Sequence, residues 1–234
     1  MNKSLVKPTI ILAVIAFIAT FALSHIKKIT YPSIQKQERQ KRDAALMAVL
    51  PGYTITEEKR APIDNREFTY WIAEKIENNA PITAYAFVTE KGGYSGPVRS
   101  MVGIDKSGRL LGIAIIQQSE TPGLGARAAE IASTDTFWGH FFGGSGATAT
   151  TEPLIPWFQE QFSGLDTTKK IEIVKRGDWN AAMKAELLEK NSISSITGAT
   201  ITTKAVRDSI ENGVQMLDRA LQTNAVPTDG GLAR

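Results

Sequence analysis

The chain has 234 residues, of which 42% are hydrophobic and 22% charged, a balance that is ordinary for a globular protein of one large or two small domains. Residues 1–42 hold eight basic residues against Glu38 alone, so this segment carries +7 and the remainder −4. A mildly acidic body argues against a nucleic-acid partner, the basic stretch fits a membrane surface, and the absence of cysteine excludes disulfides, Cys-ligated zinc, iron–sulfur clusters and thiol catalysis.

The first predicted element is an apolar helix. The nineteen residues of Pro8–Ile26 include no Lys, Arg, Asp or Glu, which is long enough to cross a membrane. A cleaved signal peptide is the alternative, because Lys3 and Lys7 make a basic start and Ala22-Leu23-Ser24 resembles a cleavage site. The run is long for a signal peptide and charges follow it at once, so we predict a retained transmembrane anchor over residues 1–26.

A helical juxtamembrane stalk is predicted over residues 27–50, ending at Pro51-Gly52, and a polar, irregular stretch follows to about residue 80. The next segments have the composition of strands: 82–89, 98–104 and 110–117. The last two flank the turn Asp105-Lys106-Ser107-Gly108, which predicts a β-hairpin.

The second half begins with a Pro/Gly turn at residues 121–125. The elements expected after it are a helix at 126–133, a loop of small residues at 143–152, a strand at 170–175, a helix at 181–188, an amphipathic helix at 205–221 and a flexible tail at 222–234. These elements predict an α+β protein, in which a single transmembrane helix precedes a domain at 51–221 with a mixed or antiparallel sheet and flanking helices.

Catalytic and metal chemistry have few candidates. The two histidines, His25 at the end of the apolar run and His140 in an aromatic cluster, do not support a multi-His metal site or a Ser-His-Asp triad. Neither a GxGxxG fingerprint nor a P-loop is present. We therefore predict no catalytic residue and no metal site.

Three glycine-bearing loops remain: Gly92–Gly96, Glu120–Gly125 and Thr197–Thr200. Each is most simply a turn, and Pro122-Gly123 fits a type II turn. Alternatively, the second loop presents backbone N–H groups and the apolar Leu124 to a flat ring, while Tyr94 covers a ring face or bonds to its edge.

The third loop leads into the last helix. Gly198 and Ala199 leave the backbone open to close approach, and the unpaired N–H groups of a first helical turn favour an anionic oxygen. Thr200 is then a hydroxyl beside a phosphate site. The alternative is that Thr200, Thr202 or Thr203 is an ordinary N-cap.

In combination these residues resemble the FMN-binding G subunit of the Rnf electron-transport complex. The related C subunit of the sodium-pumping NADH:quinone reductase is the nearest alternative. The resemblance covers the anchor and most of residues 85–221. Its motifs are Gly93–Gly96, Val102–Asp105, Glu120–Gly125, Trp157 with Gln161-Phe162, and Thr197–Thr200.

The resemblance implies one FMN per chain, attached through its phosphate to Thr200 by a separate flavin transferase that uses FAD and Mg²⁺. The other residues that we predict at the cofactor are Thr197, Gly198, Ala199, Tyr94, Gly96, Glu120, Thr121, Gly123, Leu124 and Gly125. Two departures stand out. Ser145–Thr148 matches the family's Ser-Gly-Ala-Thr more literally, which leaves Thr148 as an alternative attachment site, and Gln117–Ser119 stands where the family often has a His. We choose Thr200, because it follows the Trp157 region and leads into an amphipathic helix.

The implied function is an electron relay between reduced ferredoxin and NAD, coupled to Na⁺ or H⁺ movement, with no turnover by this chain alone. Its partners would be the other subunits, the flavin transferase and membrane lipid. The family places the domain on the periplasmic face of the cytoplasmic membrane. The basic residues after the anchor instead favour a cytoplasmic domain, although the positive-inside rule is weak for long domains, and we follow the family. The rivals are a cofactor-free tethered scaffold and a stand-alone flavin reductase.

Overall fold

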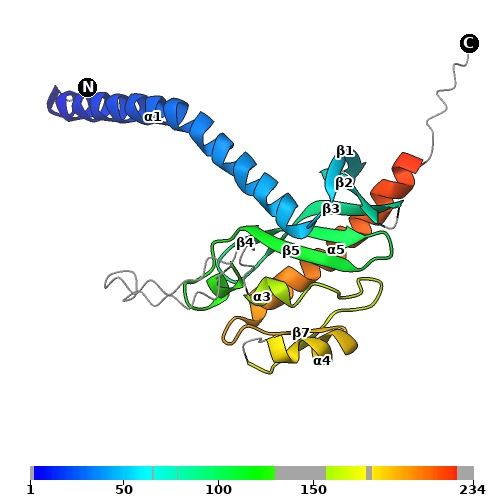
Figure 1. The fold of residues 1–234 in the computed structure, drawn as a ribbon. Helices are drawn as coiled ribbons and strands as arrows, with labels where there is room; N and C mark the ends of the chain where they lie inside the picture. Colours follow the sequence, from blue (N-terminus) through cyan, green and yellow to red (C-terminus); the bar gives the residue numbers. More distant parts are fainter. Residues whose placement is uncertain (1–2, 65, 78, 130–156, 178–180, 226–234) are drawn as a thin grey trace, which may run out of the picture. The chain divides into compact units, whose positions relative to one another are not determined.

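The computed structural model describes residues 3–64, 66–77, 79–129, 157–177 and 181–225. The chain divides into two compact units, Met1–Asp43 and Ala44–Arg234. The first is helical, and the second is an antiparallel sheet with helices on its faces (Figure 1). The predicted α+β class is confirmed.

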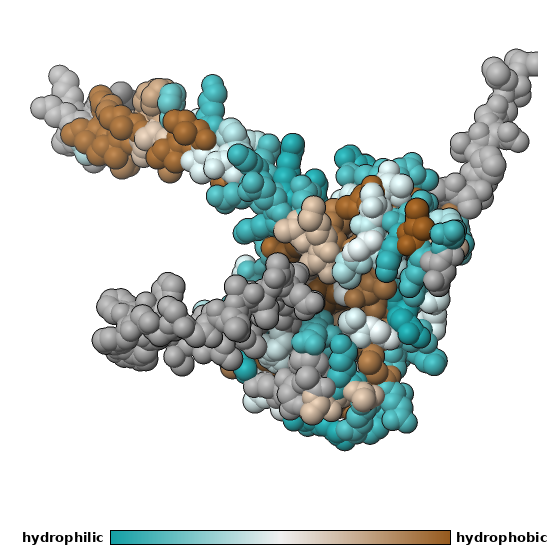
Figure 2. All heavy atoms as spheres, in the orientation of Figure 1, coloured by the Kyte–Doolittle hydropathy of each residue, from teal (hydrophilic) through white to brown (hydrophobic). Residues whose placement is uncertain are grey.

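The helix α1 spans Lys3–Val49, so the expected anchor and stalk are one continuous element. Within the described residues it is the one helix that is long and apolar enough to cross a membrane, a test that a signal sequence also passes. Figure 2 shows apolar side chains over its first part and hydrophilic ones over the part that follows. The exposed apolar side chains include Ile11, Leu12, Phe17, Ile18 and Leu23.

Five antiparallel strands form a meander in which neighbours in the sheet are also neighbours in the sequence. They are β1 (Thr54–Ile63), β2 (Arg66–Glu77), β3 (Ala80–Gly92), β4 (Pro97–Asp105) and β5 (Leu110–Gln117). The predicted turn between β4 and β5 is present. The Asp105 carboxylate accepts hydrogen bonds from the backbone N–H groups of Ser107 at 2.8 Å and Arg109 at 2.9 Å.

The prediction of an irregular stretch between residues 52 and 80 is wrong, because β1 and β2 lie there. The first seven residues of β1 are almost all exposed, as this strand is at the edge of the sheet and carries charged side chains there. In β2, Phe68 and Tyr70 are buried two residues apart in the period of a half-buried strand.

The last helix, α5, spans Thr200–Ala225 and starts five residues before its predicted beginning. It also ends four residues after its predicted end, so the flexible tail expected from residue 222 is wrong for residues 222–225. The helix lies along one face of the sheet, from the orange to the red end of the chain in Figure 1, and contacts β3 most extensively. Ile210 and Leu217 of α5 are buried in one core with Phe68 and Phe87 of the sheet. This packing fixes the direction of α5 and therefore the position of its first turn.

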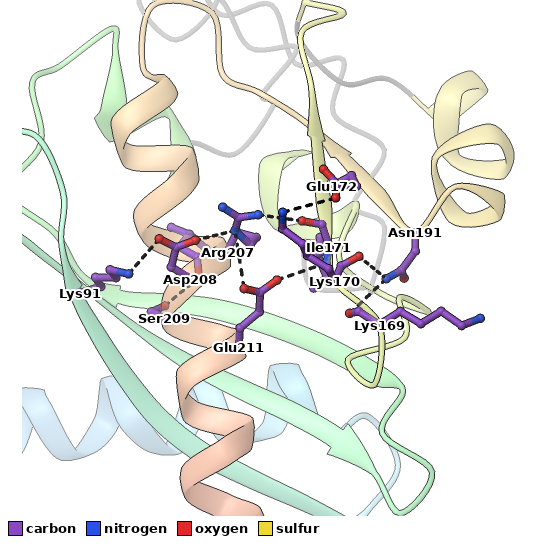
Figure 3. Close-up of polar contacts among 11 residues, drawn as sticks. Lys91, Lys169, Lys170, Ile171, Glu172, Asn191, Arg207, Asp208, Ser209 and Glu211 are labelled. Carbon is purple, nitrogen blue, oxygen red and sulfur yellow. Dashed lines mark hydrogen bonds and ion pairs between the residues drawn. The ribbon is translucent and has the colours of Figure 1, made fainter.

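Polar contacts clamp α5 from both sides, and we call Lys91, Arg207, Asp208 and Glu211 the α5 clamp (Figure 3). Lys91 Nζ on β3 lies 2.8 Å from Asp208 Oδ2, and Arg207 Nε donates to Asp208 Oδ1 at 2.6 Å. Arg207 Nη1 also donates to the backbone oxygen of Ile171 at 3.0 Å, while Glu211 accepts from the Ile171 N–H at 3.2 Å. Burial acts to raise the pKa of Asp208, but the hydrogen bonds and charges of Lys91 and Arg207 outweigh it and lower the pKa.

The opposite face of the sheet receives residues 44–50, the end of α1 and the residue after it. Leu46 and Val49 are buried there against Trp71, Met101 and a set of alanines. A side chain at Gly103 would collide with the backbone oxygen of Val49, so glycine at this position allows the end of α1 to pack against β4. The sheet is thus covered on both faces.

Short elements complete the second unit: the 3₁₀ turn η1 (Gly125–Ala129), α3 (Trp157–Glu160), β6 (Glu172–Val174), the 3₁₀ turn η2 (Ala181–Met183), α4 (Lys184–Glu189) and β7 (Ser192–Ser194). The strand expected at 170–175 is the shorter β6, and the helix expected at 181–188 is η2 followed by α4. η1 covers the start of the helix expected at 126–133, while α3 and β7 were not predicted. His140, the 143–152 loop with Thr148, and residues 226–234 of the tail lie outside the described residues.

Candidate functional site

A pocket of about 400 Å³ opens where the three glycine-bearing loops meet. Its lining residues are Tyr94, Glu120, Thr121, Leu124, Gly125, Gly198, Ala199, Thr200, Ile201 and Thr202. The structure thus brings together eight residues that the sequence assigns to a cofactor and adds Ile201 and Thr202. A larger groove of about 570 Å³, between the β4–β5 turn and the later part of α5, contains none of them.

Three further predicted residues, Thr197, Gly96 and Gly123, do not line the pocket, and the two glycines shape their loops. Gly96 accepts a hydrogen bond of 2.7 Å from the N–H of Gly93, which closes the first loop. Gly123 has φ +74°, and Leu124 N–H bonds to Thr121 O at 3.1 Å. The predicted type II turn is therefore present.

The third loop is a turn that aims α5 at the pocket. Ala199 N–H donates to Ile196 O at 3.0 Å, and Gly198, between them, has φ +78°. A Cβ atom at Gly198 would lie 2.9 Å from Leu124 Cδ2, so the glycine also lets the second loop pack against the third. Gly198 is required here by its backbone angle.

Thr203, not Thr200, secures the start of α5. The buried Thr203 hydroxyl accepts from the Ile196 N–H at 3.1 Å and donates to Ala199 O at 3.1 Å. The half-buried Thr200 makes no capping bond, and its Oγ1 lies 3.5 Å from the Ser195 hydroxyl. The N-cap interpretation of Thr200 is wrong, which leaves its hydroxyl available for chemistry.

The first turn of α5 also has unused donors. No described residue accepts a hydrogen bond from the backbone N–H groups of Thr200, Ile201 or Thr202, while the first helical bond is made by Thr203 N–H to Ala199 O at 3.0 Å. Unpaired N–H groups and the helix dipole favour an anion at this end. The Thr200 hydroxyl thus lies where a phosphate would be stabilised.

The carboxylate of Glu120 links the three loops. Glu120 is 6% exposed; its Oε1 accepts from Ser95 N–H at 3.2 Å and its Oε2 accepts from the Thr202 hydroxyl at 2.7 Å. The Ser95 and Thr121 hydroxyls are 3.1 Å apart. The sequence did not point to Ser95 or Thr202 as site residues, although Ser95 lies inside the first glycine-bearing loop and Thr202 lies two residues after the third.

Large apolar side chains form the rim of the pocket. Tyr94 is 72% exposed, Leu124 44% and Ile201 53%, and each comes from a different loop or helix. Exposed apolar groups beside a few convergent polar groups are typical of a ligand site. Together with the anion site, they suit a ligand with a flat ring and a phosphate.

The remaining motif residues lie outside the pocket lining. Trp157 is stacked under the Arg127 guanidinium, 5.4 Å from the ring centroid, and Phe162 is fully buried. The Gln161 side chain accepts from Ser194 N–H at 2.7 Å and so holds β7, from which the chain runs into the third loop. The described residues contain no group of three His, Cys, Asp or Glu that could hold a metal ion.

Two family models match the chain. The FMN-binding domain model matches residues 93–215, from the first pocket loop into α5, and the RnfG N-terminal region model matches residues 1–49. Both agree with the resemblance found in the sequence.

Curated relatives and a solved structure agree with these matches. The chain is 27% identical over 224 residues to the G subunit of the Na⁺-translocating ferredoxin:NAD⁺ oxidoreductase complex of Acetobacterium woodii, covering 92% of each chain. It is 26% identical to the G subunit of the ion-translocating oxidoreductase complex of Pasteurella multocida, over 92% of this chain and 95% of that one. The C subunit of the Na⁺-translocating NADH-quinone reductase from Parabacteroides distasonis shares the fold, with TM-score 0.52, 18% identity, and 81% and 96% of the two chains covered.

Proposed function

The chain belongs to the FMN-binding domain family, and from that premise we propose that its pocket holds one FMN, joined through the phosphate to the hydroxyl of Thr200. The observation that carries this proposal is the state of Thr200. Its side chain makes no helix cap, and it stands beside three backbone N–H groups that no described residue accepts.

The attachment uses FAD as the donor and a separate flavin transferase with Mg²⁺. Thr200 Oγ1 forms a bond to the phosphorus on the riboflavin side, the bond to the AMP phosphate breaks, and AMP leaves as the hydroxyl proton is lost. The first-turn N–H groups and the dipole of α5 stabilise the remaining phosphodiester charge. Covalent attachment retains the cofactor in a protein that works at a membrane.

The rim of the pocket supplies the contacts for the ring. Leu124 and Ile201 offer exposed apolar surface in the pocket that Thr200 lines, and Tyr94 can lie over a ring face or bond to its edge. Bound FMN supplies the redox chemistry, and the residues described here position it and tune its potential. No acid or base in the described lining is placed for substrate turnover, which favours an electron relay.

The N-terminal match and the G-subunit relatives support the assignment of this relay to an Rnf-type complex. In that assignment the chain is a single-pass protein of the cytoplasmic membrane with its FMN domain on the outer face. It passes electrons between ferredoxin and NAD with the other subunits, coupled to Na⁺ or H⁺ movement. The FMN subunit of a sodium-pumping NADH:quinone reductase is the second candidate, since the fold is shared with that subunit.

In-gel flavin fluorescence tests the proposal against its rivals. The full chain is expressed with and without a flavin transferase, and the denatured protein is examined under ultraviolet light. We expect a fluorescent band only with the transferase. A tethered scaffold would give no band in either case, and a stand-alone flavin reductase would oxidise NADH unaided, which we do not expect.

A further inference from the structure

Each carboxylate oxygen of Glu120 already accepts one hydrogen bond from within the protein. One oxygen accepts from the backbone of Ser95 in the first loop, and the other accepts from Thr202 in α5, 82 residues later in the chain. Its own N–H donates to the Gln118 side chain at 2.6 Å. Glu120 lines the pocket, yet its polar atoms are directed into the protein.

Two glycines create the space for this carboxylate. A Cβ atom at Gly93 would collide with Glu120 Oε1, and one at Gly125 would collide with Glu120 Oε2 and with Thr202 Oγ1. Neither glycine has a positive φ, so backbone freedom does not account for them. The first and second loops have glycine at positions 93 and 125 because a side chain there would collide with the carboxylate of Glu120.

We propose that Glu120 is a positioning residue that joins the two upstream loops to the first turn of α5. Through these bonds it keeps the pocket in its shape before any FMN is attached. The effect of Glu120 on the loops does not depend on the proposed function, but its effect on flavin attachment does. With the loops joined, Thr200 has a single position relative to the pocket when the flavin transferase acts on it. Without the link, both loops lose their shared anchor, and Ser95 N–H and the Thr202 hydroxyl lose a buried acceptor.

The test compares Glu120→Ala with Glu120→Gln, with Glu90→Gln as a matched control on an exposed carboxylate of β3. Glutamine can accept from Ser95 N–H through its oxygen and donate to Thr202 Oγ1 through its amide, so it restores the link without the charge. Thr202→Val removes the other partner while keeping the side-chain shape, in case Glu120→Ala does not fold.

The first readout is hydrogen exchange on the full chain without flavin. We expect Glu120→Ala and Thr202→Val to raise exchange about tenfold in residues 93–96, 120–125 and 199–203, and the double variant to add nothing further. Glu120→Gln and Glu90→Gln should match the unaltered protein. Unchanged exchange in Glu120→Ala, or equal loss in Glu120→Gln, would overturn the proposal.

The second readout is the rate at which FAD, Mg²⁺ and the transferase label the peptide Asn191–Lys204. We expect labelling about tenfold slower in Glu120→Ala and near the unaltered rate in Glu120→Gln. If the unaltered chain takes no label, the proposed function fails, while the exchange experiment still decides the role of Glu120. If Glu120→Ala labels at the unaltered rate, the positioning role is wrong and the proposed function stands.

Discussion

The ring of Phe87 in β3 lies directly against Gly213 in α5, and there is no room for a methyl group between them. Thr89, two residues along the same strand, donates a hydrogen bond to the backbone oxygen of Ser209 at 2.5 Å. Helix and sheet are therefore in close contact at the turn of α5 from Ser209 to Gly213. The position of Thr200 depends on this contact, because α5 carries it rigidly to the pocket.

Gly213→Ala should destabilise the protein although alanine is the better helix former. The added methyl group overpacks the contact with Phe87, which costs about 1–3 kcal/mol and exceeds the gain in helix propensity of about 1 kcal/mol. Thermal unfolding should show a lower midpoint. Asn212→Ala, at the exposed neighbouring residue, is the control and should not lower it; a stabilised Gly213→Ala would refute the close contact.

Gly123→Ala should disturb the pocket through backbone strain alone. Nothing lies within 4 Å of a Cβ atom at this position, but its φ is +74°, so alanine costs about 1–2 kcal/mol. Gly92 has equally open surroundings without a positive φ and serves as the matched control. We expect slower flavin labelling and faster proteolysis of the 120–125 loop only in Gly123→Ala; equal behaviour of the two variants would contradict the type II turn.

Substitutions of Thr200 and Thr203 should have different effects: the first should abolish flavin attachment, and the second should lower stability. Thr200→Ala is expected to lose the covalent flavin with a stability change within about 0.5 kcal/mol, because its hydroxyl makes no cap. Thr203→Val should keep a labelled fraction but lose about 1–3 kcal/mol, because Ile196 N–H then has no acceptor. Urea unfolding and in-gel fluorescence measure the two effects, and Thr200→Ser should retain the label.

The α5 clamp should make stability depend on pH in the acid range. The pKa of Asp208 lies below its usual 3.8 in the folded chain, so its contribution is present above that value and is lost as the pH falls through the folded pKa. Asp208→Asn should cost about 1 kcal/mol at pH 7. The difference from the unaltered protein should shrink below about pH 4 in urea unfolding curves. A constant difference down to pH 2 would show that the charge of Asp208 is not the cause.

The sequence predicted those elements that have a strong hydrophobic period or characteristic turn residues. The hairpin around Asp105, the type II turn at Gly123 and the amphipathic α5 follow from local rules, and the structure contains all three. β1 was missed because the charged side chains of this edge strand mask its period, and β2 was missed with it. Phe68 and Tyr70, two residues apart, carried the signal that could have revealed β2.

Most of the residues that line the pocket could be predicted from motifs, but the hydrogen bonds among them could not. The sequence pointed to Glu120, Thr200 and the glycines as residues near a ligand. It could not show that Glu120 bonds to Thr202, because that contact joins positions far apart in the chain. Nor could it show that Thr203 caps the turn while Thr200 does not, since both are threonines one turn apart.

Peptide mass mapping of the full chain co-expressed with a flavin transferase tests the central claim most directly. Trypsin places Thr200 in the fragment Asn191–Lys204 and Thr148 in the fragment Ala128–Lys169. We expect an FMN-sized increment on Asn191–Lys204, localised to Thr200 by fragmentation, and none on the other fragment. An increment on Ala128–Lys169, or on neither, would contradict the attachment of FMN at the start of α5.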